Sequence, residues 1–181
     1  MNANGPVTTR NAEALNGNSD PETAGQAIHA QKPKRLLLVA SAGGHWVELS
    51  ELVDAFAGFE CHFVTTVKGV KIKRQERDVI QVRDCSRNAP LSTLRTFCRL
   101  FFLIRQINPD IVLSTGAAPG AVALIIAKLR GKRTVWIESL ANCEKLSLSA
   151  LVVRPFADVK LTQWEHLAER HRDFKFQGRV V

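Results

Sequence analysis

The sequence predicts an α/β domain with a Rossmann-like, doubly wound parallel sheet, and three observations support this. Short apolar runs recur without the polar alternation of a sheet that faces water on one side, which is typical of strands buried on both faces. Stretches with helical periodicity separate these runs, as crossovers between parallel strands require. The chain of 181 residues, 45% hydrophobic and 23% charged, has the length and composition of one globular domain.

Strands and helices alternate in the predicted order. The first strand is the apolar run LLLVA, which a glycine turn and an amphipathic stretch follow. A long helix precedes the strand DIVLS, and an apolar helix then leads to the strand RTVWIE. The expected strands are 36–40, 62–67, 79–82, 110–114, 133–138 and 159–163, and the expected helices are 46–56, 91–107, 120–129, 148–156 and 164–170.

Residues 1–33 are predicted to form a flexible polar tail, and residues 34–181 the Rossmann-like domain. The tail is rich in Asn, Ala, Gly, Thr and Pro and lacks sustained periodicity. The whole chain has a net charge of +8. Because the first 31 residues carry a net charge of −2, the rest of the chain carries +10. A basic domain attracts anions such as nucleic acid, phosphorylated substrates or anionic lipid headgroups.

The four cysteines, the N-terminus and the hydropathy restrict the class of protein. Cys61, Cys85, Cys98 and Cys143 form no C-x-x-C pair, which argues against a metal site and favours reduced thiols. The N-terminus lacks the layout of a secretory signal, and no segment approaches the roughly 18 apolar residues of a membrane span. We therefore expect any membrane contact to be peripheral.

The loop after the first strand is Ser41-Ala42-Gly43-Gly44-His45. Consecutive glycines let backbone N–H groups approach a ligand, and a helix start favours negative charge. The loop is neither a dinucleotide fingerprint nor a P-loop. His45 is placed to take a proton from a substrate hydroxyl, since histidine is the side chain that ordinarily exchanges a proton near physiological pH. The alternative is a purely structural tight turn with His45 at the start of the helix.

Two further loops follow predicted strands, and ligands bind beyond the carboxyl ends of such strands. Thr115 and Gly116 begin a loop of small residues that leaves space above the sheet, or simply form a compact turn. Glu138 and Ser139 end the strand TVWIES. A carboxylate at this position is costly unless it is paired or open to a cleft, so Glu138 is a candidate for binding a sugar or orienting His45. The alternative is a solvated strand-end carboxylate.

The helix expected over 91–107 has no acidic residue, and apolar residues surround most of it. Such a helix is either buried or faces an apolar environment, and both can hold on different faces. Basic residues beside exposed aromatic ones suit the surface of an anionic membrane. The predicted membrane residues are Arg95, Phe97, Arg99, Phe101, Phe102 and Arg105.

Taken in order, four segments resemble a known family. They are SAGGH, DIVLSTGAAPG, VWIES and ADVKLTQWEHL, with Gly178 after them. The set resembles the acceptor-lobe subunits of split, two-lobed (GT-B) glycosyltransferases over about residues 35–178. Members are the PssD-type exopolysaccharide and capsule proteins of bacteria, and eukaryotic subunits that help to add the second N-acetylglucosamine to dolichol-linked oligosaccharide.

The resemblance implies a single N-terminal-type GT-B lobe that binds a polyprenyl-diphosphate-linked acceptor. The subunit would lie peripherally at the cytoplasmic face of the inner (plasma) membrane. A separate small chain would supply the lobe that binds the UDP-sugar, giving a heterodimer without metal or cofactor. The implied catalytic residues are His45 and Glu138, and the implied acceptor or phosphate-binding residues are Ser41, Gly43, Gly44, Thr115, Gly116 and Ser139.

The leading hypothesis is therefore an inverting transfer in which His45 deprotonates the acceptor hydroxyl. The sugar would come from a UDP-sugar, with glucuronic acid, N-acetylglucosamine and galactose all open, and would be added during exopolysaccharide or capsule synthesis. The alternative is a non-catalytic membrane anchor or activator of the partner subunit. A nucleic-acid-binding domain is not expected, because the basic charge comes without a recognisable reading motif.

Overall fold

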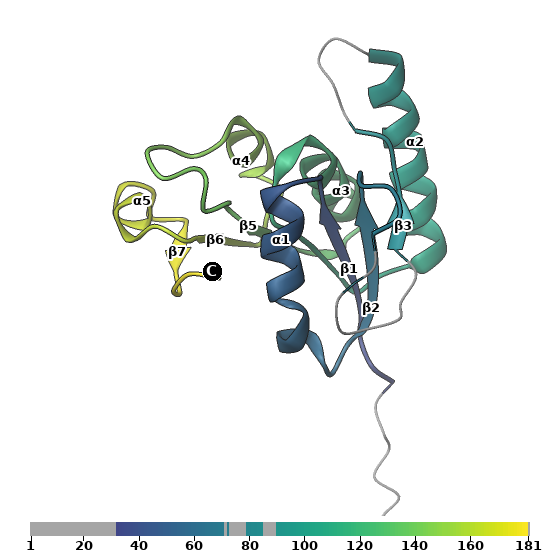
Figure 1. Ribbon diagram of the computed structural model, residues 1–181, viewed down its shortest axis with the longest axis horizontal. Coiled ribbons are helices and arrows are strands. Elements are labelled where there is room, and N and C mark those ends of the chain that lie inside the picture. Colours follow the sequence, from purple (N-terminus) through teal and green to yellow (C-terminus); the bar gives the residue numbers. More distant parts are fainter. Residues whose placement is uncertain (1–31, 71, 73–78, 85–89, 181) are drawn as a thin grey trace, which may run out of the picture. The chain divides into compact units, whose positions relative to one another are not determined.

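In the part of the chain that the computed structural model describes, seven parallel strands form one sheet (Figure 1). The described residues are 32–70, 72, 79–84 and 90–180, so the predicted tail lies outside them except for its last two positions. The strand order is β3-β2-β1-β4-β5-β6-β7. The strands are β1 (Arg35–Ala40), β2 (Glu60–Thr65), β3 (Val79–Gln81), β4 (Ile111–Ser114), β5 (Arg133–Ile137), β6 (Val159–Thr162) and β7 (Lys175–Phe176).

The strand order confirms the predicted doubly wound, Rossmann-like sheet. From β1 the chain moves outward to β2 and β3, and then returns to the other side of β1 with β4. In register, Leu36 of β1 lies opposite Ile111 of β4 on one side and Cys61 of β2 on the other. The direction of winding reverses between β1 and β4, and doubly wound sheets bind ligands in the crevice beyond the carboxyl ends of the two strands at such a switch point.

Helices cover both faces of the sheet. One apolar cluster joins one face of the sheet to α2, α3 and α4, and a second joins the other face to α1 and η1. Strand β1 supplies both clusters, because Leu37 and Val39 face α2 and α3 whereas Leu36 and Leu38 face α1. The helices are α1 (Gly44–Glu51), the 3₁₀ helix η1 (Val53–Phe56), α2 (Pro90–Ile107), α3 (Ala117–Leu129), α4 (Leu148–Val153) and α5 (Glu165–Arg170).

Several boundaries differ from the prediction. The single helix expected over 46–56 ends at Glu51 and continues as η1, which is the tightening into a 3₁₀ turn that helix ends often show. The helix expected over 148–156 ends at Val153, and helix α3 begins three residues before its predicted start. Strand β7 was not predicted, since two residues carry no periodic pattern.

Candidate active site

The loops that follow β1 and β4 meet at the crevice through His45 and Thr115. The hydroxyl of Thr115 donates a hydrogen bond to the carbonyl oxygen of His45 at 2.7 Å. In return, Nδ1 of the His45 ring lies 3.1 Å from the carbonyl oxygen of Thr115. These two reciprocal bonds join residues 70 positions apart in sequence. The structure thus brings together the histidine loop and the small-residue loop that the sequence singled out.

The hydrogen bond to Thr115 determines which nitrogen of the neutral His45 ring carries the proton. A carbonyl oxygen only accepts hydrogen bonds, so Nδ1 must carry the proton when the ring is neutral. Nε2 then holds the free lone pair, which is the form a general base requires. The residue is half-buried, so the ring is held by the protein and still borders solvent.

Gly116 fits the space directly against the His45 ring. A Cβ atom added at this position would lie 2.4 Å from both Cε1 and Nδ1 of the ring. The backbone φ of Gly116 is +143°, which also disfavours any residue with a side chain. A glycine is required here for two reasons, and both concern the placement of the histidine.

Gly43 and Gly44 form the exposed wall of the loop at the start of α1. Gly43 has φ +79°, its carbonyl oxygen accepts the first helical bonds from Trp46 and Val47, and a Cβ at either glycine would meet open space. No side chain caps this helix and its first turn has no acidic residue. The helix start therefore presents free backbone donors of the kind that bind anions.

The three hydroxyl residues of the predicted binding set lie in the interior. Ser41, Thr115 and Ser139 are at most 7% exposed. Their hydroxyl groups donate to protein oxygens: Ser41 to the carbonyl of Ala42 at 3.4 Å, Thr115 to His45, and Ser139 to the Glu48 carboxylate at 2.7 Å. They hold the loops in place, and the surface of the crevice is left to Gly43, Gly44 and His45.

Glu138 is completely buried, so the alternative of a solvated strand-end carboxylate is wrong. One carboxylate oxygen accepts a hydrogen bond from Nε1 of Trp136 at 2.7 Å. The other accepts bonds from Nδ2 of Asn142 at 2.7 Å and from the backbone N–H of Ser147 at 2.9 Å. These bonds fasten the loop between β5 and α4, and they meet the burial cost that the sequence had indicated.

Glu48 and Gln163 belong to this buried polar layer, and sequence reasoning missed them. The Glu48 carboxylate on α1 accepts bonds from Ser139 and from the backbone N–H of Leu140 at 3.1 Å, and the Gln163 amide donates to it at 3.2 Å. Gln163 also accepts from the backbone N–H of Val180 at 2.9 Å. Gln163 directly follows β6, as Glu138 directly follows β5. A polar residue at the end of a buried strand is therefore the sequence feature from which Gln163 could have been identified.

Helix α2 has both a core face and an exposed apolar face, as the sequence allowed. Phe97, Phe101 and Phe102 are 43%, 36% and 63% exposed. The guanidinium carbon of Arg130 also lies 5.7 Å from the centroid of the Phe101 ring. Among the described residues, no helix combines the length and the apolar character that crossing a membrane requires. The core face consists of Thr96, Leu100, Leu103 and Ile104, and the exposed arginines are Arg95, Arg99 and Arg105.

A protein-family model for "Oligosaccharide biosynthesis protein Alg14 like" matches residues 59–180. The chain belongs to the Alg14-like family. The resemblance drawn from the four sequence segments is therefore confirmed. The chain is 27% identical over 180 residues to the UDP-N-acetylglucosamine transferase subunit ALG14 of Mus musculus, covering 81% of this chain and 83% of that protein. The subunit of the same name from Eremothecium gossypii is 25% identical over 181 residues, covering 82% and 81%.

Comparison with solved structures supports a fold that corresponds to one lobe of a GT-B protein. Acinetobacter baumannii MurG superposes with a TM-score of 0.64 at 17% identity, covering 75% of this chain and 43% of that one. The UDP-N-acetylglucosamine 2-epimerase of Rickettsia bellii superposes with a TM-score of 0.65 at 16% identity, covering 82% and 46%. The chain thus spans less than half the length of each of these proteins.

Proposed function

We propose that this chain is the acceptor-binding, membrane-associated subunit of a two-chain inverting glycosyltransferase. The observation that carries the proposal is the position of the His45 ring at the switch point, with Nδ1 3.1 Å from the carbonyl oxygen of Thr115. Because a carbonyl oxygen only accepts hydrogen bonds, this contact leaves Nε2 as the basic nitrogen of the neutral ring. A general base in this crevice, beside a helix start that favours phosphate, suits a transfer to a hydroxyl of a phosphorylated acceptor. Names of family relatives support the reaction class.

In the proposed step, Nε2 of His45 takes the proton of the acceptor hydroxyl. The oxygen attacks the anomeric carbon of the donor sugar, and the bond from that carbon to the UDP oxygen breaks with its electron pair leaving on UDP. Attack opposite the leaving group inverts the anomeric configuration. Thr115 and Gly116 position the ring, and the Glu138 and Glu48 carboxylates position the loops around it.

A second chain would bind the UDP-sugar. One GT-B lobe is present, and the relatives are named as subunits of a UDP-N-acetylglucosamine transferase, so we propose a heterodimer with UDP-N-acetylglucosamine as donor. The acceptor would be a polyprenyl-diphosphate-linked saccharide at the cytoplasmic face of the membrane. The exposed aromatic and basic face of α2 supports peripheral membrane contact.

The decisive test is His45→Ala in the reconstituted pair. Loss of a general base is expected to lower the rate of transfer by about 10²–10⁴-fold. The variant should still assemble with its partner, since the ring makes one hydrogen bond and lies half-buried. His171→Ala is the matched control, because this histidine follows α5 and precedes β7, toward the amino ends of the strands and thus away from the crevice. Transfer at the native rate by His45→Ala would leave the non-catalytic anchor as the function.

The membrane role of α2 is tested with vesicles that contain phosphatidylglycerol. Replacing Phe97 and Phe102 together by Ser is expected to weaken vesicle binding at least about tenfold, because each exposed ring would bury apolar surface in the interface. Val47→Ser on α1, 53% exposed on the opposite face of the sheet, is the control and should bind as the native chain does. Equal binding by all three proteins in a flotation assay would contradict the assignment.

A further inference from the structure

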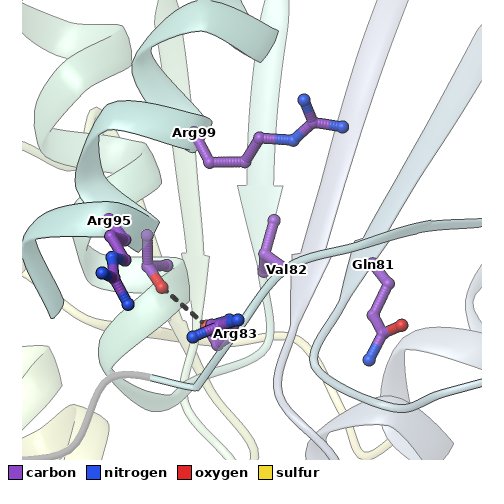
Figure 2. A pocket seen from close by; sticks show the side chains of 6 residues that line it. Gln81, Val82, Arg83, Arg95 and Arg99 are labelled. Atoms are coloured by element: carbon purple, nitrogen blue, oxygen red, sulfur yellow. Dashed lines mark hydrogen bonds between the residues drawn. The ribbon is translucent and has the colours of Figure 1, made fainter. Parts of the chain in front are cut away.

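Three arginines line a cavity of about 180 Å³ between the end of β3 and the first half of α2 (Figure 2). Arg83 comes from the segment after β3, and Arg95 and Arg99 lie four residues apart on one side of α2. The hydroxyl of Thr96 donates to the carbonyl oxygen of Arg83 at 2.9 Å and so fastens the two elements together. Gln81, Val82 and Thr96 complete the lining.

Among the described residues, the cavity concentrates positive charge without a compensating group. None of the described lining residues is acidic, and no ion pair within the described part of the chain neutralises any of the three guanidinium groups. Asp84 follows Arg83 but is not part of the lining and has an interaction of its own. Like charges around one cavity repel, and a bound anion removes that repulsion. The guanidinium fork is also the geometry that matches phosphate oxygens.

The cavity fits the phosphate part of a ligand and is too small for a saccharide. Pockets that enclose drug-sized molecules have about 300–1,000 Å³. A diphosphate diester carries two negative charges, whereas the phosphate of a lipid such as phosphatidylglycerol carries one. Three guanidinium groups therefore match the diphosphate better.

The cavity lies near both His45 and helix α2, the two parts of the molecule on which the proposed function rests. β3 is separated from β1 by one strand, so the carboxyl ends of β3 and β1 lie about 10 Å apart, and His45 follows β1. At 3.6 residues per turn, the exposed ring of Phe102 lies on the same side of α2 as Arg95 and Arg99, whereas Phe97 and Phe101 lie on the opposite flank. The exposed aromatic side chain next to the cavity is therefore that of Phe102.

We infer, on the basis of the proposed function, that this arginine cavity binds the diphosphate that joins the acceptor saccharide to its lipid. The lipid then leaves the cavity along the exposed ring of Phe102, and the saccharide reaches over the carboxyl ends of the strands toward His45. Arg83, Arg95 and Arg99 contact the phosphate oxygens, and Arg105, which does not line the cavity, remains for the membrane surface.

Binding to the full chain is measured by calorimetry with farnesyl diphosphate, a soluble prenyl diphosphate, and with inorganic pyrophosphate. The variant carrying both Arg83→Gln and Arg99→Gln is expected to bind each about 100-fold more weakly, at about tenfold for each charged hydrogen-bonding group removed. The variant carrying both Arg133→Gln and Arg172→Gln removes the same charge from exposed positions outside the cavity and should keep the native affinity within about a factor of two. Arg83→Lys with Arg99→Lys should fall between them, because the charge remains and the fork is lost.

Equal losses in the two Gln variants would overturn the inference, since they would indicate general electrostatic attraction. A native chain that binds neither diphosphate would overturn it too, as would a cavity variant that loses affinity only for phosphatidylglycerol vesicles. Binding needs neither partner nor transfer. Diphosphate binding without transfer therefore refutes only the proposed function, whereas transfer with unchanged affinity in the cavity variant refutes only the cavity. All replaced arginines are exposed, and thermal unfolding checks that the variants stay folded.

Discussion

At the carboxyl ends of the strands, the carboxyl edge of the sheet, the polar side chains are buried. At the amino ends of the strands, the amino edge, they are largely exposed. Glu48, Glu138 and Gln163 are at most 4% exposed and bond to loops that follow different strands. At the amino edge Lys128 pairs with Asp158, and Arg154 with Asp173, with side chains 31% to 41% exposed. The two ends of the strands in this one sheet therefore carry two kinds of polar structure.

The difference follows from what each edge must do. Exposed ion pairs contribute little and tolerate movement, which is sufficient where loops only turn the chain round. A buried carboxylate is costly to desolvate and fixes its hydrogen-bond partners closely once they are in place. The crevice beside His45 is surrounded by loops held in this second way. The carboxyl edge is thus the part of the molecule in which position is specified most strongly.

The largest effect is expected from Glu138→Ala. The change leaves three donors without an acceptor, on Trp136, Asn142 and Ser147, and should lower the free energy of unfolding by about 3–5 kcal/mol. Urea denaturation measures this loss. The same substitution at Asp173 on the amino edge, whose carboxylate pairs with the exposed Arg154, is the comparison and should cost clearly less. Similar losses at the two edges would remove the distinction between them.

Two glycine variants separate the effect of displacing the His45 ring from the effect of backbone strain. Gly116→Ala puts a Cβ 2.4 Å from the His45 ring, and should lower transfer by about 10²-fold because a displacement of about 1 Å has that effect. Gly131→Ala at the amino edge also has positive φ, +70°, but its Cβ would meet open space. It should cost about 1–2 kcal/mol of stability and leave transfer unchanged. Steady-state rates of both variants with the partner decide the point.

The two edges also differed in how far the sequence could predict them. Apolar runs and glycine turns are local signals, so strands β1 to β6 and the loops at Gly43 and Thr115 were identified correctly, whereas the two-residue strand β7 was not. Burial of a polar side chain depends on partners far away in sequence. Glu48 bonds to a residue 91 positions later, and no periodic pattern announces such a contact. For the same reason Glu138 was identified as unusual, whereas its three donors were not.

The cavity at α2 shows the same limit. Arg95 and Arg99 were predicted to contact a membrane, because a basic and aromatic helix is the local pattern of such a surface. Arg83 was not singled out, since only the pairing of β3 with β2 and the packing of α2 bring it to the same cavity. Sequence indicated the charge, and tertiary structure decides which of the arginines act together.

The smallest effect is a pH dependence at the amino edge, tested with Asp158→Asn. Partial burial, the largest single influence, raises the pKa of Asp158, but hydrogen bonds from Lys128 and Thr134 outweigh it and hold the pKa below its ordinary value. A carboxyl group with a lowered pKa in the folded state stabilises the fold above its unfolded pKa of about 3.9, and this contribution is lost as the pH falls through the folded value. Asp158→Asn should therefore lower the free energy of unfolding by about 1 kcal/mol at pH 7, a figure kept small because the pair is partly exposed. The difference from the native chain should shrink as urea denaturation is repeated toward pH 2–3. Glu51→Gln, at an exposed position on α1, removes the same charge as a control. If the difference in unfolding free energy between the variant and the native chain stays constant with pH, the loss comes from packing. The ion pair of the amino edge then stabilises the fold no more than any other surface contact does.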